Sequence, residues 1–93
     1  MCIRDRAVEW GLVNKSVKAS DLMNEAGSAA EMLAAGPRAA YGRIKELFNS
    51  SLTTPLETQM ENEARYLSLA AQSPDGQEGI KAFLTKTAPH FTE

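Results

Sequence analysis

Apolar residues recur every three or four positions through most of this chain, and Pro and Gly separate the stretches that carry this spacing. Leu22, Ala26, Ala29 and Leu33 follow one another at intervals of four, three and four, and Gly36 then ends the stretch. Residues spaced in this way share one face of an α-helix. The pattern therefore predicts a mainly α chain whose helices each carry one apolar stripe.

Three more helices are predicted from the residues at their starts. Pro37 suits the first position of a helix, where its missing N–H is not needed. Thr54 and Glu57 form the pattern of a capping box around Pro55, so we expect the next helix to begin there. A last helix is expected over residues 74–87. The buried face of the helix after Pro55 should consist of five apolar residues: Leu56, Met60, Ala64, Leu67 and Ala71.

The residues before Ser20 predict a different local structure. Residues 7–10 are typical of the last turn of a helix, and Gly11 can take the left-handed conformation that follows such a turn. Residues 12–17 alternate apolar and polar side chains well enough to predict one short strand. An isolated strand has no partner for its backbone N–H and C=O groups. We therefore expect it to belong to a sheet outside this chain, and we expect Trp10 and the methionines to be core residues.

Composition limits the class of protein. A chain of 93 residues makes at most one small domain, which buries about 60–65% of its unfolded surface and has a marginal core. The net charge of −2, with 24% charged residues, excludes the basic surface that is expected of a nucleic-acid-binding protein. No apolar run is long enough to span a membrane, and the start does not have the pattern of a signal peptide. We expect a cytoplasmic protein that needs a protein partner.

The first six residues are interpreted as foreign to the protein. M-C-I-R-D-R can be translated back into ATG TGT ATA AGA GAC AG and one further base, which resembles the transposase mosaic end used to build sequencing libraries. The alternative is a genuine short N-terminus. We expect residues 1–6 to be adaptor sequence and leave them out of the fold reasoning. Cys2, the only cysteine, then carries no disulfide or metal site.

The stretch from Ser73 to Phe91 is the most informative part of the chain. Ser73 can cap a helix that Pro74 opens, and Pro89 follows its end. Its full pattern, S-x-D-x-x-E-G, then A-F-L-x-K, then P-x-F, resembles the closing segment of the enoyl-CoA hydratase/isomerase family, the crotonase superfamily. The segments A-V-E-W-G-L-V-N-K (residues 7–15) and L-A-A-G-P (residues 33–37) extend the resemblance. It covers residues 7–92 but only the last third of such an enzyme.

The resemblance implies a domain organisation and a function. Residues 7–17 would be the end of the crotonase-like α/β core, and residues 18–93 its C-terminal helical domain, with about four helices beside the orphan strand. The parent enzyme would act on an acyl-CoA thioester as a homo-oligomer, a trimer or a dimer of trimers. Coenzyme A is then part of the substrate, and no separate cofactor or metal is expected.

The parent's reaction is left open by the sequence. In the family two backbone N–H groups hold the thioester oxygen and one or two carboxylates move protons, and all of these groups lie upstream of Ala7 in family order. We therefore assign no catalytic residue. Hydration of a 2-enoyl-CoA is our first choice, and double-bond or ring isomerisation of an acyl-CoA is the alternative. A third possibility is an independent helical module that binds a protein through its apolar stripes.

Phe83 and Lys86 are the candidate coenzyme A residues. In the family the Phe and Lys at these places help to hold coenzyme A, usually that of the neighbouring subunit, so Phe83 would offer a ring to the adenine and Lys86 a charge to a phosphate. The competing interpretation packs Phe83 inward with Ile80 and Leu84, while Lys86 complements the negative end of its helix. Thr87 stands where many relatives have Arg.

Other candidates for chemistry have simpler explanations. Asp21 with Glu25, and Glu61 with Glu63, could be paired carboxylates, but each pair lies among other charged residues. We interpret both pairs as solvated surface. His90 follows Pro89 beyond the last helix and has no nucleophile near it in the sequence, so we interpret it as a surface residue of the tail.

Overall fold

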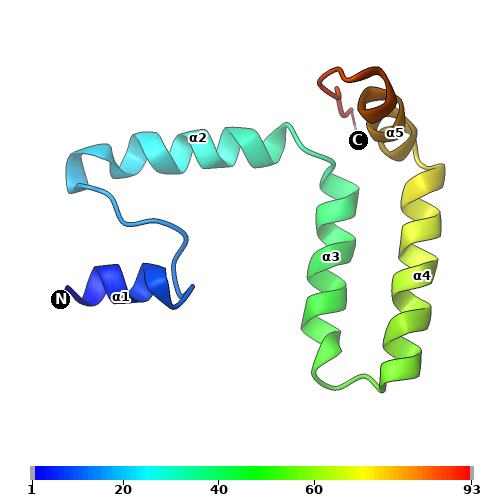
Figure 1. Cartoon of the computed structure of the whole chain (residues 1–93), viewed down its shortest axis with the longest axis horizontal. Coiled ribbons are helices and arrows are strands. Elements are labelled where there is room, and N and C mark those ends of the chain that lie inside the picture. Colours follow the sequence, from blue (N-terminus) through cyan, green and yellow to red (C-terminus); the bar gives the residue numbers. More distant parts are fainter. Residues whose placement is uncertain (1, 93) are drawn as a thin grey trace. The chain divides into compact units, whose positions relative to one another are not determined.

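The protein is described by a computed structural model, which covers residues 2–92. These residues form five α-helices and a short 3-10 helix, η1, at Ala19–Asp21 (Figure 1). The α-helices are α1 (Ile3–Glu9), α2 (Leu22–Ala34), α3 (Arg38–Ser51), α4 (Leu56–Gln72) and α5 (Pro74–Thr85). The prediction of a mainly α chain is confirmed. None of the helices within the described residues is long and apolar enough to cross a membrane.

The chain divides into two units, Met1–Glu31 and Met32–Glu93. In the first unit the predicted strand at residues 12–17 is wrong, because these residues form bends and irregular chain. The physical reason is that the backbone N–H and C=O groups of these residues have no neighbouring strand to pair with in the described chain. The prediction at Gly11 is confirmed, since this residue follows α1 with a φ of 72°. The predicted segments 1–6, 7–17 and 18–93 stay predictions, and Met1 and Glu93 lie outside the described residues.

In the second unit α3 and α4 lie side by side and run in opposite directions, and α5 follows α4 at a sharp corner (Figure 1). The capping box predicted at the start of α4 is wrong. Thr54 instead donates its hydroxyl to the carbonyl oxygen of Ser50 at 2.8 Å, and no side chain caps α4 at Pro55. The same carbonyl oxygen also accepts from the backbone N–H groups of Thr53 and Thr54, because the last turn of a helix has carbonyl groups that no residue within the helix can pair with.

Very little of the described chain is buried. Among residues 2–92 only Gly36, Asp75 and Ala82 are buried. The predicted core positions are therefore wrong for this chain: Trp10 is 72% exposed and Met60 is 61% exposed. The stripes have the helical spacing that burial requires, but no segment of the described chain covers them.

Candidate functional site

The start of α5 is fixed by local hydrogen bonds. The cap predicted at Ser73 is confirmed, because its hydroxyl oxygen accepts from the backbone N–H of Gly76 at 3.0 Å. The same hydroxyl donates to the carbonyl oxygen of Ala70, in the last turn of α4, at 2.8 Å. One side chain therefore ends α4 and begins α5, and it holds the corner between them.

The end of α5 lies earlier than the sequence predicts. The helix ends at Thr85, and Lys86 follows it in the left-handed conformation with a φ of 56°. The Lys86 N–H donates to the carbonyl oxygen of Phe83 at 3.3 Å, and the Thr87 N–H donates to that of Ala82 at 3.0 Å. This is the hydrogen-bond pattern of a Schellman motif, with Lys86 in the place that Gly usually takes.

Phe83 and Lys86 lie together at this end of α5, and both are exposed. The ring of Phe83 is 84% exposed, and Leu84 is 73% exposed. Most other large apolar residues of the described chain are exposed as well, so both interpretations of Phe83 stay predictions. An exposed ring can stack on a planar base, and a nearby ammonium group can pair with a phosphate. The side chain of Thr87 lies within hydrogen-bond distance of Thr85, with 2.9 Å between their hydroxyl oxygens.

The residues after Lys86 turn back along α5 (Figure 1). The backbone N–H of His90 donates to the carboxylate of Glu78 at 3.1 Å. The backbone N–H of Thr92 donates to the carboxylate of Asp75 at 2.8 Å. The His90 side chain is exposed, as we interpreted it. The sequence analysis did not find these two contacts, because a hydrogen bond between residues 17 positions apart leaves no periodic signal.

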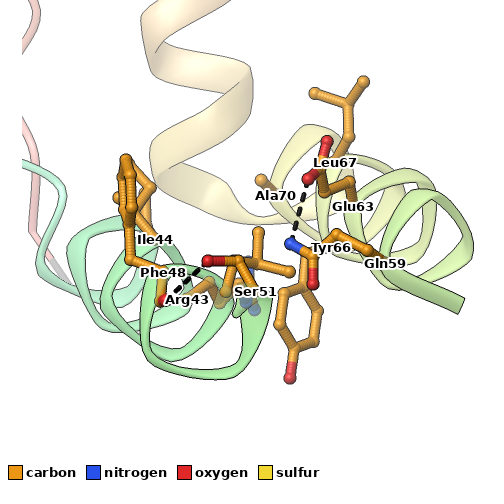
Figure 2. Close-up of a pocket in the computed structure, with 11 residues that line it drawn as sticks. Arg43, Ile44, Phe48, Ser51, Gln59, Glu63, Tyr66, Leu67 and Ala70 are labelled. Carbon is orange, nitrogen blue, oxygen red and sulfur yellow. Dashed lines mark hydrogen bonds between the residues drawn. The ribbon is translucent and has the colours of Figure 1, made fainter. Parts of the chain in front are cut away.

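A groove of about 550 Å³ lies between α3 and α4 (Figure 2). Its apolar lining includes Ile44 and Phe48 on α3 and Leu67, which belongs to the predicted stripe of α4. Gln59 lies at its polar side, where its amide donates to the carboxylate of Glu63 at 3.0 Å. The amide oxygen of Gln59 is buried and has no hydrogen-bond partner. The sequence predicts the stripes but not the groove, since helical spacing does not determine how two helices approach each other.

A hydrogen bond between Tyr66 on α4 and Glu46 on α3 joins the two helices beside the groove. The Glu46 carboxylate accepts a hydrogen bond from Tyr66, which raises the pKa of that phenol above its ordinary value of 10.0. The guanidinium of Arg65 lies over the same ring, 5.1 Å from its centroid. Hydroxyl and ring thus both have charged neighbours.

The other candidates are in surface positions. Glu25 is paired with Lys15, and the carboxylate of its predicted partner Asp21 accepts from the hydroxyl of Ser20 at 3.0 Å. Glu61 and Glu63 are both exposed residues of α4. Across residues 2–92, no group of three or more His, Cys, Asp and Glu side chains is placed to hold a metal ion.

Comparison with known proteins gives consistent matches. The family model described as enoyl-CoA hydratase/isomerase matches residues 4–93. The chain is 40% identical over 88 residues to the 1,2-epoxyphenylacetyl-CoA isomerase of Escherichia coli K12, and 39% identical to a probable enoyl-CoA hydratase of Rhodobacter capsulatus. Both matches cover 95% of this chain and 34% of the relative.

The match to solved structures agrees. An enoyl-CoA hydratase from Polaromonas sp. JS666 superimposes with a TM-score of 0.87 at 35% identity, over 95% of this chain and 34% of that one. The chain thus spans about a third of the length of the proteins that it matches.

Proposed function

The chain belongs to the enoyl-CoA hydratase/isomerase family, and from this premise we propose that it is the C-terminal part of an enoyl-CoA hydratase, which adds water to a 2-enoyl-CoA thioester. The observation that carries the proposal is the family match over residues 4–93. A relative described as a probable enoyl-CoA hydratase, 39% identical, supports this choice of reaction. The parent's activity is a proposal because the chain spans only a third of such a relative.

In this reaction the hydroxyl group of water adds to the β-carbon, and a proton adds to the α-carbon of an enolate. Backbone N–H groups aimed at the thioester oxygen stabilise that enolate, and carboxylates move the protons. We propose that these groups lie in the part of the parent that precedes Ala7. The present chain then contributes coenzyme A contacts and oligomer contacts and has no catalytic residue.

The coenzyme A contacts are proposed at Phe83 and Lys86. What supports this is the family match, which includes both residues, and their position at the same end of α5. The ring would stack on the adenine, and the ammonium group would pair with a phosphate. The exposed apolar stripes support the proposal that other protein surface, from the parent and its copies, covers these helices.

An isomerase is the second candidate, and one observation favours it. The relative with 40% identity is described as a 1,2-epoxyphenylacetyl-CoA isomerase. The catalytic carboxylates of the parent would distinguish the two reactions. Sequence reads extended upstream of codon 7 would identify them, whereas a native start codon just before Ala7 would favour the independent helical module.

The test of the coenzyme A contact uses the full-length parent enzyme with Lys86→Gln. We expect KM for crotonyl-CoA to rise about two- to tenfold with kcat nearly unchanged, because a remote charge contact stabilises the ground and transition states alike. Added salt should shrink the difference. Lys81→Gln is the matched control, since Lys81 is likewise an exposed lysine and lies on α5, five positions before Lys86.

Two results would contradict the contact. One is an unchanged KM in Lys86→Gln. The other is an equal rise in KM for a short thioester that lacks the nucleotide, because such a substrate offers nothing for Lys86 to hold. The 93-residue chain alone should leave the absorbance of the conjugated thioester unchanged, and turnover that survives repurification would show that the chain contains catalytic groups.

A further inference from the structure

The last residues of the chain form a strap, defined here as residues 88–92, which is tied to the first turns of α5. The backbone N–H of Thr92 donates a hydrogen bond to the carboxylate of Asp75 at 2.8 Å, and the backbone N–H of His90 donates one to the carboxylate of Glu78 at 3.1 Å. Asp75 is 4% exposed, in a chain where almost every other residue is accessible. A carboxylate that accepts a backbone N–H in a buried position makes a stronger hydrogen bond than a neutral acceptor does.

The face of α5 beneath the strap is shaped to receive it. Asp75, Gly79 and Ala82 follow at intervals of four and three, so they share one helix face. The last two are small, and they allow the strap to approach the helix backbone closely. Phe91 lies over Gly79, where a Cβ would be 3.7 Å from its ring. Phe91 also lines a cavity of about 200 Å³ together with residues of α3 and α4.

The strap has a consequence for Lys86. Both ends of the reversal are held, by the Thr87 N–H on Ala82 at one end and by the Thr92 N–H on Asp75 at the other. Lys86 lies just before the strap, inside the turn that the Thr87 N–H closes on Ala82, and it keeps a φ of 56°, which costs energy for any residue with a Cβ. Without the Asp75 anchor, the strap is held only at His90, and the turn at Lys86 is held only by its own local hydrogen bonds. Lys86 can then relax to a more favourable conformation that points its side chain elsewhere.

We propose that Asp75, assisted by Glu78, is a positioning residue that holds the strap and so fixes where Lys86 presents its ammonium group. This inference rests on the proposed role of Lys86 in binding coenzyme A. Asp75 itself would not touch the substrate, because its carboxylate is buried beneath the strap. Its effect on binding would pass through Thr92 and the turn at Lys86.

The first test examines the strap without any substrate. Amide hydrogen exchange of Thr92 is measured in the 93-residue chain and in its Asp75→Ala variant. We expect the Thr92 amide to be protected in the unsubstituted chain and to exchange on the order of tenfold faster in Asp75→Ala. Asp75→Asn should retain most of the protection, because its amide oxygen can still accept. Glu57→Ala is the matched control, since Glu57 also lies in the first turn of a helix.

The second test uses the full-length enzyme and its kinetics. Asp75→Ala should raise KM for crotonyl-CoA about as much as Lys86→Gln does, with kcat unchanged. The double variant should show no further rise, because two changes that act through one contact are not additive. Asp75→Asn should restore KM close to that of the parent.

The outcomes separate this inference from the proposed function. If Lys86→Gln leaves KM unchanged, the coenzyme A contact fails, and the exchange of Thr92 still decides whether the strap exists. If Lys86→Gln raises KM and Asp75→Ala does not, or if the two effects multiply, the positioning role is wrong. An unprotected Thr92 amide in the unsubstituted 93-residue chain would show that the strap is not held on α5.

Discussion

Gly76 and Gly79 lie one turn apart on α5, and the same substitution should have opposite effects at the two positions. A Cβ at Gly76 would stand 1.8 Å from the carbonyl oxygen of Ala70, which is backbone at the corner between α4 and α5. A Cβ at Gly79 would lie 3.7 Å from the ring of Phe91, an ordinary van der Waals contact. We therefore expect Gly76→Ala to destabilise the corner and Gly79→Ala to stabilise the helix.

The magnitudes follow from two terms. Replacing Gly by Ala inside a helix gains about 0.5–1 kcal/mol. At Gly79 no clash opposes this gain, so the free energy of unfolding should rise by about that amount. At Gly76 the carbonyl of Ala70 would have to retreat by about 1.5 Å to reach a normal carbon–oxygen contact, and such overpacking costs about 1–3 kcal/mol. The net effect of Gly76→Ala should be a loss of up to about 2.5 kcal/mol, after the helix gain is subtracted.

The assay is urea unfolding of the 93-residue chain, followed by its helical circular dichroism. Gly42→Ala in α3 is the matched control, because nothing lies within 4 Å of the Cβ that it adds. It reports the helix term alone. If Gly76→Ala unfolds at the same urea concentration as Gly79→Ala and Gly42→Ala, then the corner does not hold Ala70 against α5, and the argument is wrong.

Three other predictions concern the turn, the phenol and the exposed stripes. Lys86→Gly should raise the free energy of unfolding by about 1 kcal/mol in urea titrations, because Gly takes a positive φ without the cost of a Cβ; an unchanged midpoint would contradict the left-handed turn. In a Tyr41→Phe background, absorbance titration should give Tyr66 a pKa above 10.0, which Glu46→Gln should lower. Because the pKa of Tyr66 is raised in the folded state, its hydrogen bond to Glu46 stabilises the fold at pH values below the ordinary pKa of the phenol, and this stabilisation is lost as the pH rises through the pKa of the folded state. Equal pKa values of Tyr66 with and without Glu46→Gln would contradict the contact. The exposed stripes predict self-association in sedimentation experiments, and a monomer with a sharp cooperative transition would favour the independent module.

The features that sequence could predict are those encoded by neighbouring residues. The helix stripes follow from spacing, the cap at Ser73 from a hydroxyl beside Pro74, and the turn at Gly11 from a residue without a Cβ. In each case the physical cause acts within one helical turn. The wrong predictions are instructive for the same reason. The hydroxyl of Thr54 could bond forward or backward, and it bonds backward to the carbonyl oxygen of Ser50 at the end of α3.

The candidate site was predictable only in part. Helical spacing places Phe83 on α5, but its exposure depends on what else packs against the helix. Lys86 lies beyond the end of α5, in a left-handed turn where Gly is the usual residue. The strap could not be predicted, because its contacts join Asp75 to Thr92 across a turn of irregular chain. The groove depends on how α3 and α4 approach each other, which periodicity leaves undetermined.

A last prediction follows from the contrast between stripes and corner. Leu67 is 72% exposed although its spacing on α4 is that of a core residue. In this chain Leu67→Ala should change the free energy of unfolding by less than about 0.5 kcal/mol, as surface substitutions usually do. In the full-length parent, where we propose that protein surface covers α4, the same change should cost about 2–5 kcal/mol. Urea unfolding of both proteins measures the difference. A small cost in the parent would mean that the stripe stays exposed there, and the helices would then carry their apolar faces for a separate partner protein.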